Sequence, residues 1–260
     1  MRHWIMALGI AAAVAITHLA SAAEPVTATP PGTITPEPDK GVEVMRSILR
    51  QPEDRIDLAR AKIAIDHLVD PSVDEVATFK AVDQWVDRVR SRIPAGATTW
   101  TKVMAVYSTL YVAGPWNDYK KFVYNFEDPF AKDDHTSMLS NYLATRRGNC
   151  VTMPIFFAIL ARGVGLHVAL ATAPTHLFVK VKLDDGQWKN IEATSGTTMT
   201  DQEVAQQNQI TPAAIENGLY LRPLTMRETV VEIAQLLFRD YLDRHSPEQI
   251  MAMVDLAVSN

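Results

Sequence analysis

The chain has 260 residues, of which 47% are hydrophobic and 21% are charged, and its formal net charge is −5 at pH 7. These values are typical of a globular protein with one sizeable core. The absence of a basic excess or a basic cluster argues against a nucleic-acid partner. Cys150 is the only cysteine, which excludes a fold held by internal disulfides.

Residues 1–22 have the pattern of a secretory signal peptide. Arg2 precedes an apolar segment, and the small residues around Ala22 fit a signal-peptidase site. The alternative is an uncleaved membrane anchor, but the apolar run is shorter than the roughly 20 residues of a membrane span. We therefore expect cleavage near Ala22 and a periplasmic or secreted protein with no stable membrane anchor.

The mature chain is expected to begin with a linker and to continue with helices. Residues 23–40 hold five prolines among small and polar residues, which predicts a disordered linker. Apolar side chains then recur at spacings of three and four, which predicts helical structure over residues 42–68, 74–93 and 101–112. Residues 41–113 should therefore form a helical layer.

Residues 114–135 are predicted to form a long irregular loop rich in aromatic and acidic side chains. Such a loop forms either the wall of a groove or a packed cover over the core. The run Asp133-Asp134-His135 contains metal-ligand types, but adjacent residues do not converge on one ion, and no second cluster is visible to complete a site. We therefore expect no metal and no cofactor.

The segment from 147 to 160 changes from a polar stretch to a long apolar run, which predicts a loop followed by a helix. Cys150 then lies at or just before the helix N-terminus, where unpaired backbone N–H groups and the helix dipole favour a thiolate. Pro154 fits only in the first turn, which favours Thr152 over Asn149 as the N-cap. The alternative is that Cys150 is simply a small buried apolar residue.

After this helix the pattern changes to strands. Residues 166–172, 176–183 and 187–193 have strand character, and Asp184-Asp185-Gly186 signals a hairpin turn between the second and third. Every second side chain from Leu177 onward is apolar and should face the core. His176 should therefore point to the opposite face of the sheet, together with the lysines of its strand.

The length of the hairpin loop decides whether Glu192 joins His176. A two-residue loop would place the carboxylate on the core face, whereas a three-residue loop at 184–186 would pair Phe178 with Glu192. Burying a carboxylate on an apolar face is costly, so we expect the three-residue loop. His176 and Glu192 would then be diagonal neighbours within hydrogen-bond reach.

Three segments resemble the motifs of the transglutaminase-like superfamily of papain-type cysteine enzymes. They are Arg147–Cys150 with the helix that follows, Thr175–Val179, and Trp188–Thr194. Their order along the chain, with cysteine before histidine before carboxylate, is the order of that superfamily. In the third segment Glu192 stands for the usual aspartate and Ala193 for the usual proline.

The resemblance implies an α+β fold. It places a cysteine-bearing helix against an antiparallel sheet in a core over residues 114–222, behind the N-terminal helical layer. Within the superfamily, residues 55–245 look like the SirB-like branch. The apolar spacing in residues 223–260 also resembles one tetratricopeptide-like helical hairpin, which we expect to be a packed appendage because one repeat cannot form a solenoid.

The resemblance also implies a catalytic triad of Cys150, His176 and Glu192. The expected function is an exported hydrolase or peptidase that cleaves an amide bond in a protein or peptide through a thioester. Many members of the SirB-like branch lack the cysteine, so the alternative is a non-catalytic binding or scaffold protein; a cross-linking transglutaminase comes third. The Cys150 N–H is a natural oxyanion donor, with Trp116 and Tyr124 as candidates for a second.

Overall fold

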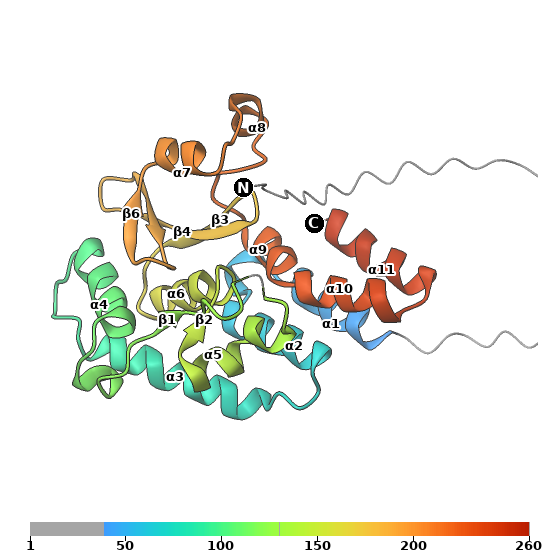
Figure 1. Cartoon of the computed structure of the whole chain (residues 1–260), viewed down its shortest axis with the longest axis horizontal. Helices are drawn as coiled ribbons and strands as arrows, with labels where there is room; N and C mark the ends of the chain where they lie inside the picture. Colours follow the sequence, from blue (N-terminus) through green and yellow to red (C-terminus); the bar gives the residue numbers. More distant parts are fainter. Residues whose placement is uncertain (1–38, 130, 260) are drawn as a thin grey trace, which may run out of the picture. The chain divides into compact units, whose positions relative to one another are not determined.

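The computed structural model describes residues 39–129 and 131–259 (Figure 1). The expected signal peptide and the linker as far as residue 38 lie outside these described residues. The described residues belong to one compact unit. Within them, no helix combines the length and the apolar character that crossing a membrane would require.

The N-terminal part is helical, as the periodicity predicts. Its elements are α1 (Lys40–Leu49), the 3-10 turn η1 (Glu53–Arg55), α2 (Leu58–Val69), α3 (Glu75–Arg90) and α4 (Thr99–Tyr111). The stretch expected to be helical over 42–68 is interrupted between α1 and α2. Pro52 precedes η1, and the Asp57 side chain starts α2 by accepting a hydrogen bond from the backbone N–H of Arg60.

A buried ion pair ties this layer to the next segment. Lys62 Nζ donates to Asp66 Oδ1 at 2.5 Å and to the carbonyl oxygen of Ser137 at 2.9 Å. Asp66 Oδ2 accepts from the backbone N–H of Leu139 at 2.8 Å. Both charged side chains are 1% exposed, and these bonds fix the start of α5 (Leu139–Thr145) against α2.

The aromatic and acidic segment is largely irregular but contains short elements. They are the 3-10 turns η2 (Pro115–Asn117) and η3 (Asp134–Ser137), and β1 (Val123–Tyr124), which pairs in parallel with β2 (Arg147–Gly148). The pairing sets Tyr124 opposite Gly148, two residues before Cys150. This loop therefore reaches the neighbourhood of the cysteine.

The main sheet is antiparallel, with strand order β3-β4-β5-β6. Its strands are β3 (Val168–Ala173), β4 (His176–Lys182), β5 (Trp188–Glu192) and β6 (Thr197–Met199), of which β6 was not expected from the sequence. Val179 lies opposite Ile191, and Leu183 donates its N–H to Gln187, so the loop is the three-residue one at 184–186. The expected register is confirmed, and its continuation sets Phe178 opposite Glu192.

Helix α6 (Thr152–Gly163) occupies the centre of the fold. Each of its residues from Thr152 to Ala161 is buried, because the sequence is apolar on all sides of the helix. It contacts β3 and β4 on one side and α3 and α4 on the other (Figure 1). The N-terminal end of α6 is thereby held against the sheet.

The second face of the sheet is covered as well. Phe178 and Lys180, which point to the same face as His176, are 1% and 2% exposed. Lys180 Nζ donates to Asn190 Oδ1 at 2.9 Å and to Asp201 Oδ1 at 2.6 Å. Asp201 begins α7 (Asp201–Gln207), which precedes α8 (Pro212–Glu216). A lysine on the polar side of the strand is thus part of the interior, neutralised by a residue from another element.

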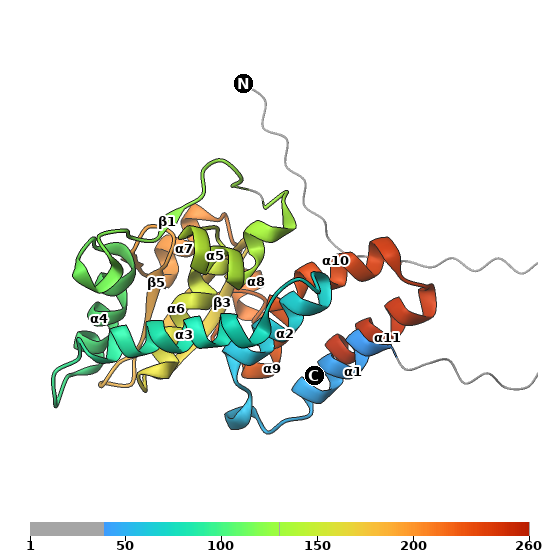
Figure 2. The ribbon, with the colours of Figure 1, turned by 90° about the horizontal axis from the view of Figure 1, so that it is seen from below.

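The C-terminal part consists of α9 (Met226–Ile233), α10 (Gln235–Arg244) and α11 (Pro247–Val258). Helices α10 and α11 contact each other as the expected hairpin, and α11 also contacts α1 (Figure 2). The Tyr241 hydroxyl donates to Asp39, which caps α1 by accepting from the N–H of Val42. The two ends of the described chain therefore pack together.

Candidate active site

Cys150 lies between β2 and α6, two residues before the helix begins at Thr152. Asn149 Oδ1 accepts hydrogen bonds from the backbone N–H groups of Val151 and Thr152, each at 3.0 Å. Val151 occupies the N-cap position of α6, so the expectation that Thr152 is the N-cap is wrong, and the Asn149 side chain instead holds the turn that leads into the helix. Thr152 is the first helical residue, and its Oγ1 accepts from the N–H of Asn149 at 3.1 Å. Asn149 is 1% exposed, so its side chain is a buried anchor for this turn next to the cysteine.

The Cys150 side chain is half-buried, and its thiol faces the turn that joins β3 to β4. The sulfur donates to the carbonyl oxygen of Thr175, with an Sγ to O distance of 3.9 Å. Among the described residues, no hydrogen bond involves the backbone N–H of Cys150. That N–H is available to an oxygen atom of a bound molecule beside the sulfur.

His176 and Glu192 lie together, on neighbouring strands. Nε2 of His176 is 2.6 Å from Oε2 of Glu192, and the two side chains are 20% and 13% exposed. The other carboxylate oxygen, Oε1, accepts from the backbone N–H of Thr194 at 3.0 Å and from its hydroxyl at 2.5 Å. Both oxygens of Glu192 are occupied, so the carboxylate holds the imidazole in one orientation.

The charges of these groups are coupled. Burial by itself would lower the pKa of His176, but the neighbouring Cys150 side chain, the hydrogen bond to Glu192 and the negative charge of that carboxylate raise it to about 9. The hydrogen bond of the Cys150 sulfur itself goes to the carbonyl oxygen of Thr175. Burial would raise the pKa of Glu192, yet the hydrogen bonds from His176 and Thr194 hold it below its usual range. The imidazole is therefore cationic at neutral pH, next to the cysteine and against a carboxylate.

The two suggested partners for an oxyanion differ in the structure. The indole N–H of Trp116 donates to the carbonyl oxygens of Ser108 and Val112, at 2.9 and 3.0 Å, so Trp116 holds the loop rather than the site. The Tyr124 hydroxyl donates to the carbonyl oxygen of Pro129 at 3.2 Å. Burial and then the charge of the Cys150 side chain raise the pKa of Tyr124, which places this phenol near the sulfur.

Tyr111, the last residue of α4, is a neighbour of the site that sequence reasoning missed. Its hydroxyl is buried and has no hydrogen-bond partner among the described residues. Burial and then the charge of Glu192 raise the pKa of Tyr111 well above its ordinary value. Only its place at the end of an apolar helix could have pointed to it, because nothing in the sequence relates α4 to β5.

The described residues contain no group of three or more histidine, cysteine, aspartate or glutamate side chains arranged to hold a metal ion. The run from 133 to 135 makes separate ion pairs instead. Nδ1 of His135 is 3.0 Å from Oδ1 of Asp133, and its Nε2 is 3.3 Å from Oδ2 of Asp70. Asp134 pairs with Arg239 of α10. These side chains fasten η3 to the surrounding helices.

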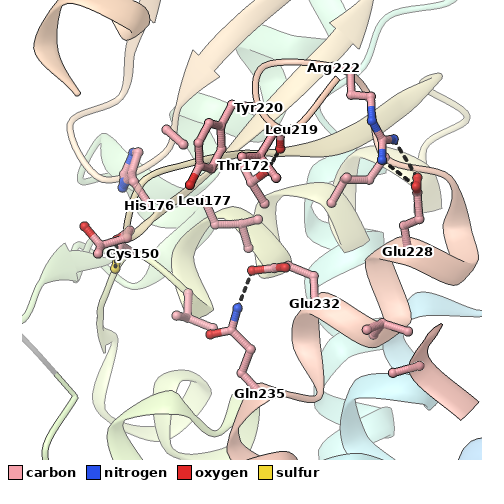
Figure 3. A pocket seen from close by; sticks show the side chains of 16 residues that line it. Cys150, Thr172, His176, Leu177, Leu219, Tyr220, Arg222, Glu228, Glu232 and Gln235 are labelled. Atoms are coloured by element: carbon pink, nitrogen blue, oxygen red, sulfur yellow. Dashed lines mark hydrogen bonds and ion pairs between the residues drawn. The ribbon is translucent and has the colours of Figure 1, made fainter. Parts of the chain in front are cut away.

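A pocket of about 620 Å³ opens beside Cys150 and His176 (Figure 3). It extends from the turn before β4 to α9, and part of its wall is apolar, formed by the side chains of Leu177, Leu219, Leu224 and Val231. Since the thiol and the imidazole both line one end, a molecule in this pocket would present its atoms directly to them. The arrangement suits nucleophilic attack by a thiol on a bound carbonyl group.

Comparison with curated proteins found no match. Comparisons with solved structures and with protein families gave two findings. One is a crystal structure of menin reported to reveal the binding site for Mixed Lineage Leukemia (MLL) protein, which is similar at 19% sequence identity with a TM-score of 0.47. The similarity covers 83% of this chain and 55% of the menin chain. The chain thus spans about half the length of that protein.

The other finding comes from protein families. The sequence model of the family described as the transglutaminase-like superfamily matches residues 77–235. The match runs from α3 to the start of α10, covers more than half of the chain, and includes Cys150, His176 and Glu192. The chain belongs to the transglutaminase-like superfamily.

Proposed function

We propose that the protein is an exported cysteine hydrolase that cleaves an amide bond in a protein or peptide. The observation that carries this proposal is the 2.6 Å contact between His176 and Glu192 beside the single cysteine, at one end of a pocket. Export rests on the signal-peptide pattern of residues 1–22 alone. The hairpin of α10 and α11 supports placement in the SirB-like branch, whose tail it resembles.

The proposed reaction starts from the ion pair in which the proton of the Cys150 thiol resides on the imidazole of His176. The sulfur attacks the carbonyl carbon of the amide, and the backbone N–H of Cys150 binds the oxygen as it gains negative charge. The C–N bond then breaks, His176 returns the proton to the leaving amine, and the acyl group remains on sulfur as a thioester. Water, deprotonated by His176, attacks the thioester and releases the acid and the free enzyme.

Glu192 acts through the imidazole in this scheme. Its Oε2 lies 2.6 Å from Nε2 and so fixes the orientation of the ring, and its charge stabilises the imidazolium. Glutamate is longer than the usual aspartate, but the two hydrogen bonds from Thr194 hold its second oxygen in place. The longer side chain is therefore held at both of its oxygens.

The proposal is tested by incubating the protein with a mixture of peptides from denatured proteins. New peptide termini are then sought by mass spectrometry. We expect new termini with the wild-type protein and none with Cys150→Ala. Added hydroxylamine should intercept the thioester as a hydroxamate. A cross-linking enzyme would instead attach an added primary amine to glutamine side chains. Cleavage that persists in Cys150→Ala would contradict the proposal, and a scaffold protein would give neither product.

A further inference from the structure

The pocket beside Cys150 contains a carboxylate at its α9 end. Glu232 lines the pocket, and Figure 3 shows its carboxylate pointing from α9 into the space between Leu177 and Gln235. The side chain is half-buried, and the amide nitrogen of Gln235 donates to its Oε1. A carboxylate therefore faces the same cavity as the thiol.

The other charged pair of this wall is already neutralised. Arg222 donates to both oxygens of Glu228, with N to O distances of 2.7 and 2.5 Å. Hydrogen bonds from Arg222 come first among the causes that lower the pKa of Glu228 to about 2. Arg222 is thus committed to Glu228 and does not serve Glu232.

Glu232 has no positively charged partner among the described residues. Within the part of the chain that the structure describes, no ion pair involves this side chain. Burial raises its pKa, and no charged neighbour opposes the effect. Removing a carboxylate from water without a counter-charge costs free energy, whereas a neutral amide of the same shape would cost much less. A positively charged group entering the pocket would recover that free energy.

We propose that Glu232 forms a subsite for a cationic substrate group, an ammonium or a guanidinium, in the pocket where Cys150 reacts. The inference rests on the proposed function, because it takes Cys150 as the reacting atom. It narrows the substrate to an amide whose chain carries a lysine-like or arginine-like group. The aliphatic stem of such a group would lie along the wall of Leu177 and Val231.

Matched alkylating reagents test the subsite without a known substrate. N-alkyl iodoacetamides of two to six carbons, ending in an ammonium or in a hydroxyl, react with Cys150 as the only thiol. We measure the ratio of their rate constants, each divided by the value for N-acetylcysteine. At the best chain length the wild-type ratio should be about fivefold in favour of the ammonium, the upper end for a partly exposed ion pair.

Three variants decide the outcome. Glu232→Gln keeps the shape of the side chain and should bring the ratio to about one. Gln235→Lys should do the same, because it supplies a resident cation at an exposed position beside Glu232. Glu248→Gln removes the same charge from an exposed position of α11 outside the pocket and should leave the ratio unchanged.

Equal ratios in the wild type, Glu232→Gln and Gln235→Lys would overturn the proposal. The hydroxyl reagent reports separately on the proposed function. If its rate is the same in the wild type and in His176→Ala, the thiol is not paired with the imidazole and the hydrolase proposal fails. The ratio of the two reagents still tests the subsite in that case.

Discussion

Replacing His176 with alanine should slow the alkylation of Cys150 at pH 6 by about fivefold. The imidazolium beside the sulfur stabilises the thiolate, which is the form that reacts. An isolated thiol with a pKa of about 8.5 is less than about 1% ionised at pH 6. Because the thiolate is such a small fraction, the rate is proportional to that fraction. A change of about 1.4 kcal/mol in the free energy of the thiolate changes the rate by about tenfold.

The magnitude follows from the coupling of the three side chains. The rise of the His176 pKa from 6.5 to about 9 corresponds to roughly 3 kcal/mol in favour of the charged ring. Because the ring is partly exposed, we reduce this to about 2 kcal/mol for screening by solvent. Both Cys150 and Glu192 contribute to this stabilisation of the charged ring, and we assign about 1 kcal/mol to each. Removing the ring therefore removes about 1 kcal/mol of favourable interaction with the Cys150 side chain, which corresponds to about fivefold in the rate of alkylation.

The assay is the rate of iodoacetamide addition between pH 5 and pH 9, followed by the mass of the intact protein. Glu192→Gln should slow the reaction less than His176→Ala, because it loosens the imidazole without removing it. His167→Ala is the matched control, since its imidazole is exposed and lies against Trp188 on another part of the sheet. Overlapping profiles for the wild type and His176→Ala, with midpoints near that of a free thiol, would refute the reasoning.

Three further predictions concern stability in urea. The raised pKa of His176 contributes stability that is fully present below pH 6.5 and is lost as pH rises through about 9, so the wild-type advantage over His176→Gln should shrink by about 2 kcal/mol across that window. Lys62→Met leaves Asp66 buried without its 2.5 Å partner and should cost about 3–5 kcal/mol, whereas exposed Lys80→Met should change unfolding by less than about 0.5 kcal/mol. Tyr111→Phe removes a buried hydroxyl that lacks a partner among the described residues, so it should be neutral or stabilising; a loss above about 1 kcal/mol would contradict this.

The contact between His176 and Glu192 could be predicted because it depends on local rules. Side chains alternate along a strand, and the turn at 184–186 sets the register of the next strand. The cost of burying a carboxylate then selects between the two possible loops. None of these steps requires knowledge of a distant element, so the sequence of one hairpin is sufficient.

The parts that could not be predicted depend on residues far apart in the chain. Lys180 has the alternation of a solvent-facing residue, and only the arrival of Asp201 from α7 explains its burial. Tyr111 reaches Glu192 because α4 packs against α6, which no local pattern indicates. The N-cap at Val151 was missed because proline position and residue preference describe the helix start only to within a few residues.

The thiol and the imidazole of the site come from two elements that meet at one turn. Cys150 is held by α6, whose buried surfaces fix it between the sheet and the helical layer, whereas His176 is the first residue of β4. The residue before His176, Thr175, has a φ of 58°, a value in the left-handed region that a β-branched side chain adopts only at a cost of about 1–3 kcal/mol. Glycine would remove this strain. The carbonyl oxygen of this strained residue also accepts from the Cys150 thiol. The strained turn therefore lies where the sulfur meets the strand that carries the imidazole.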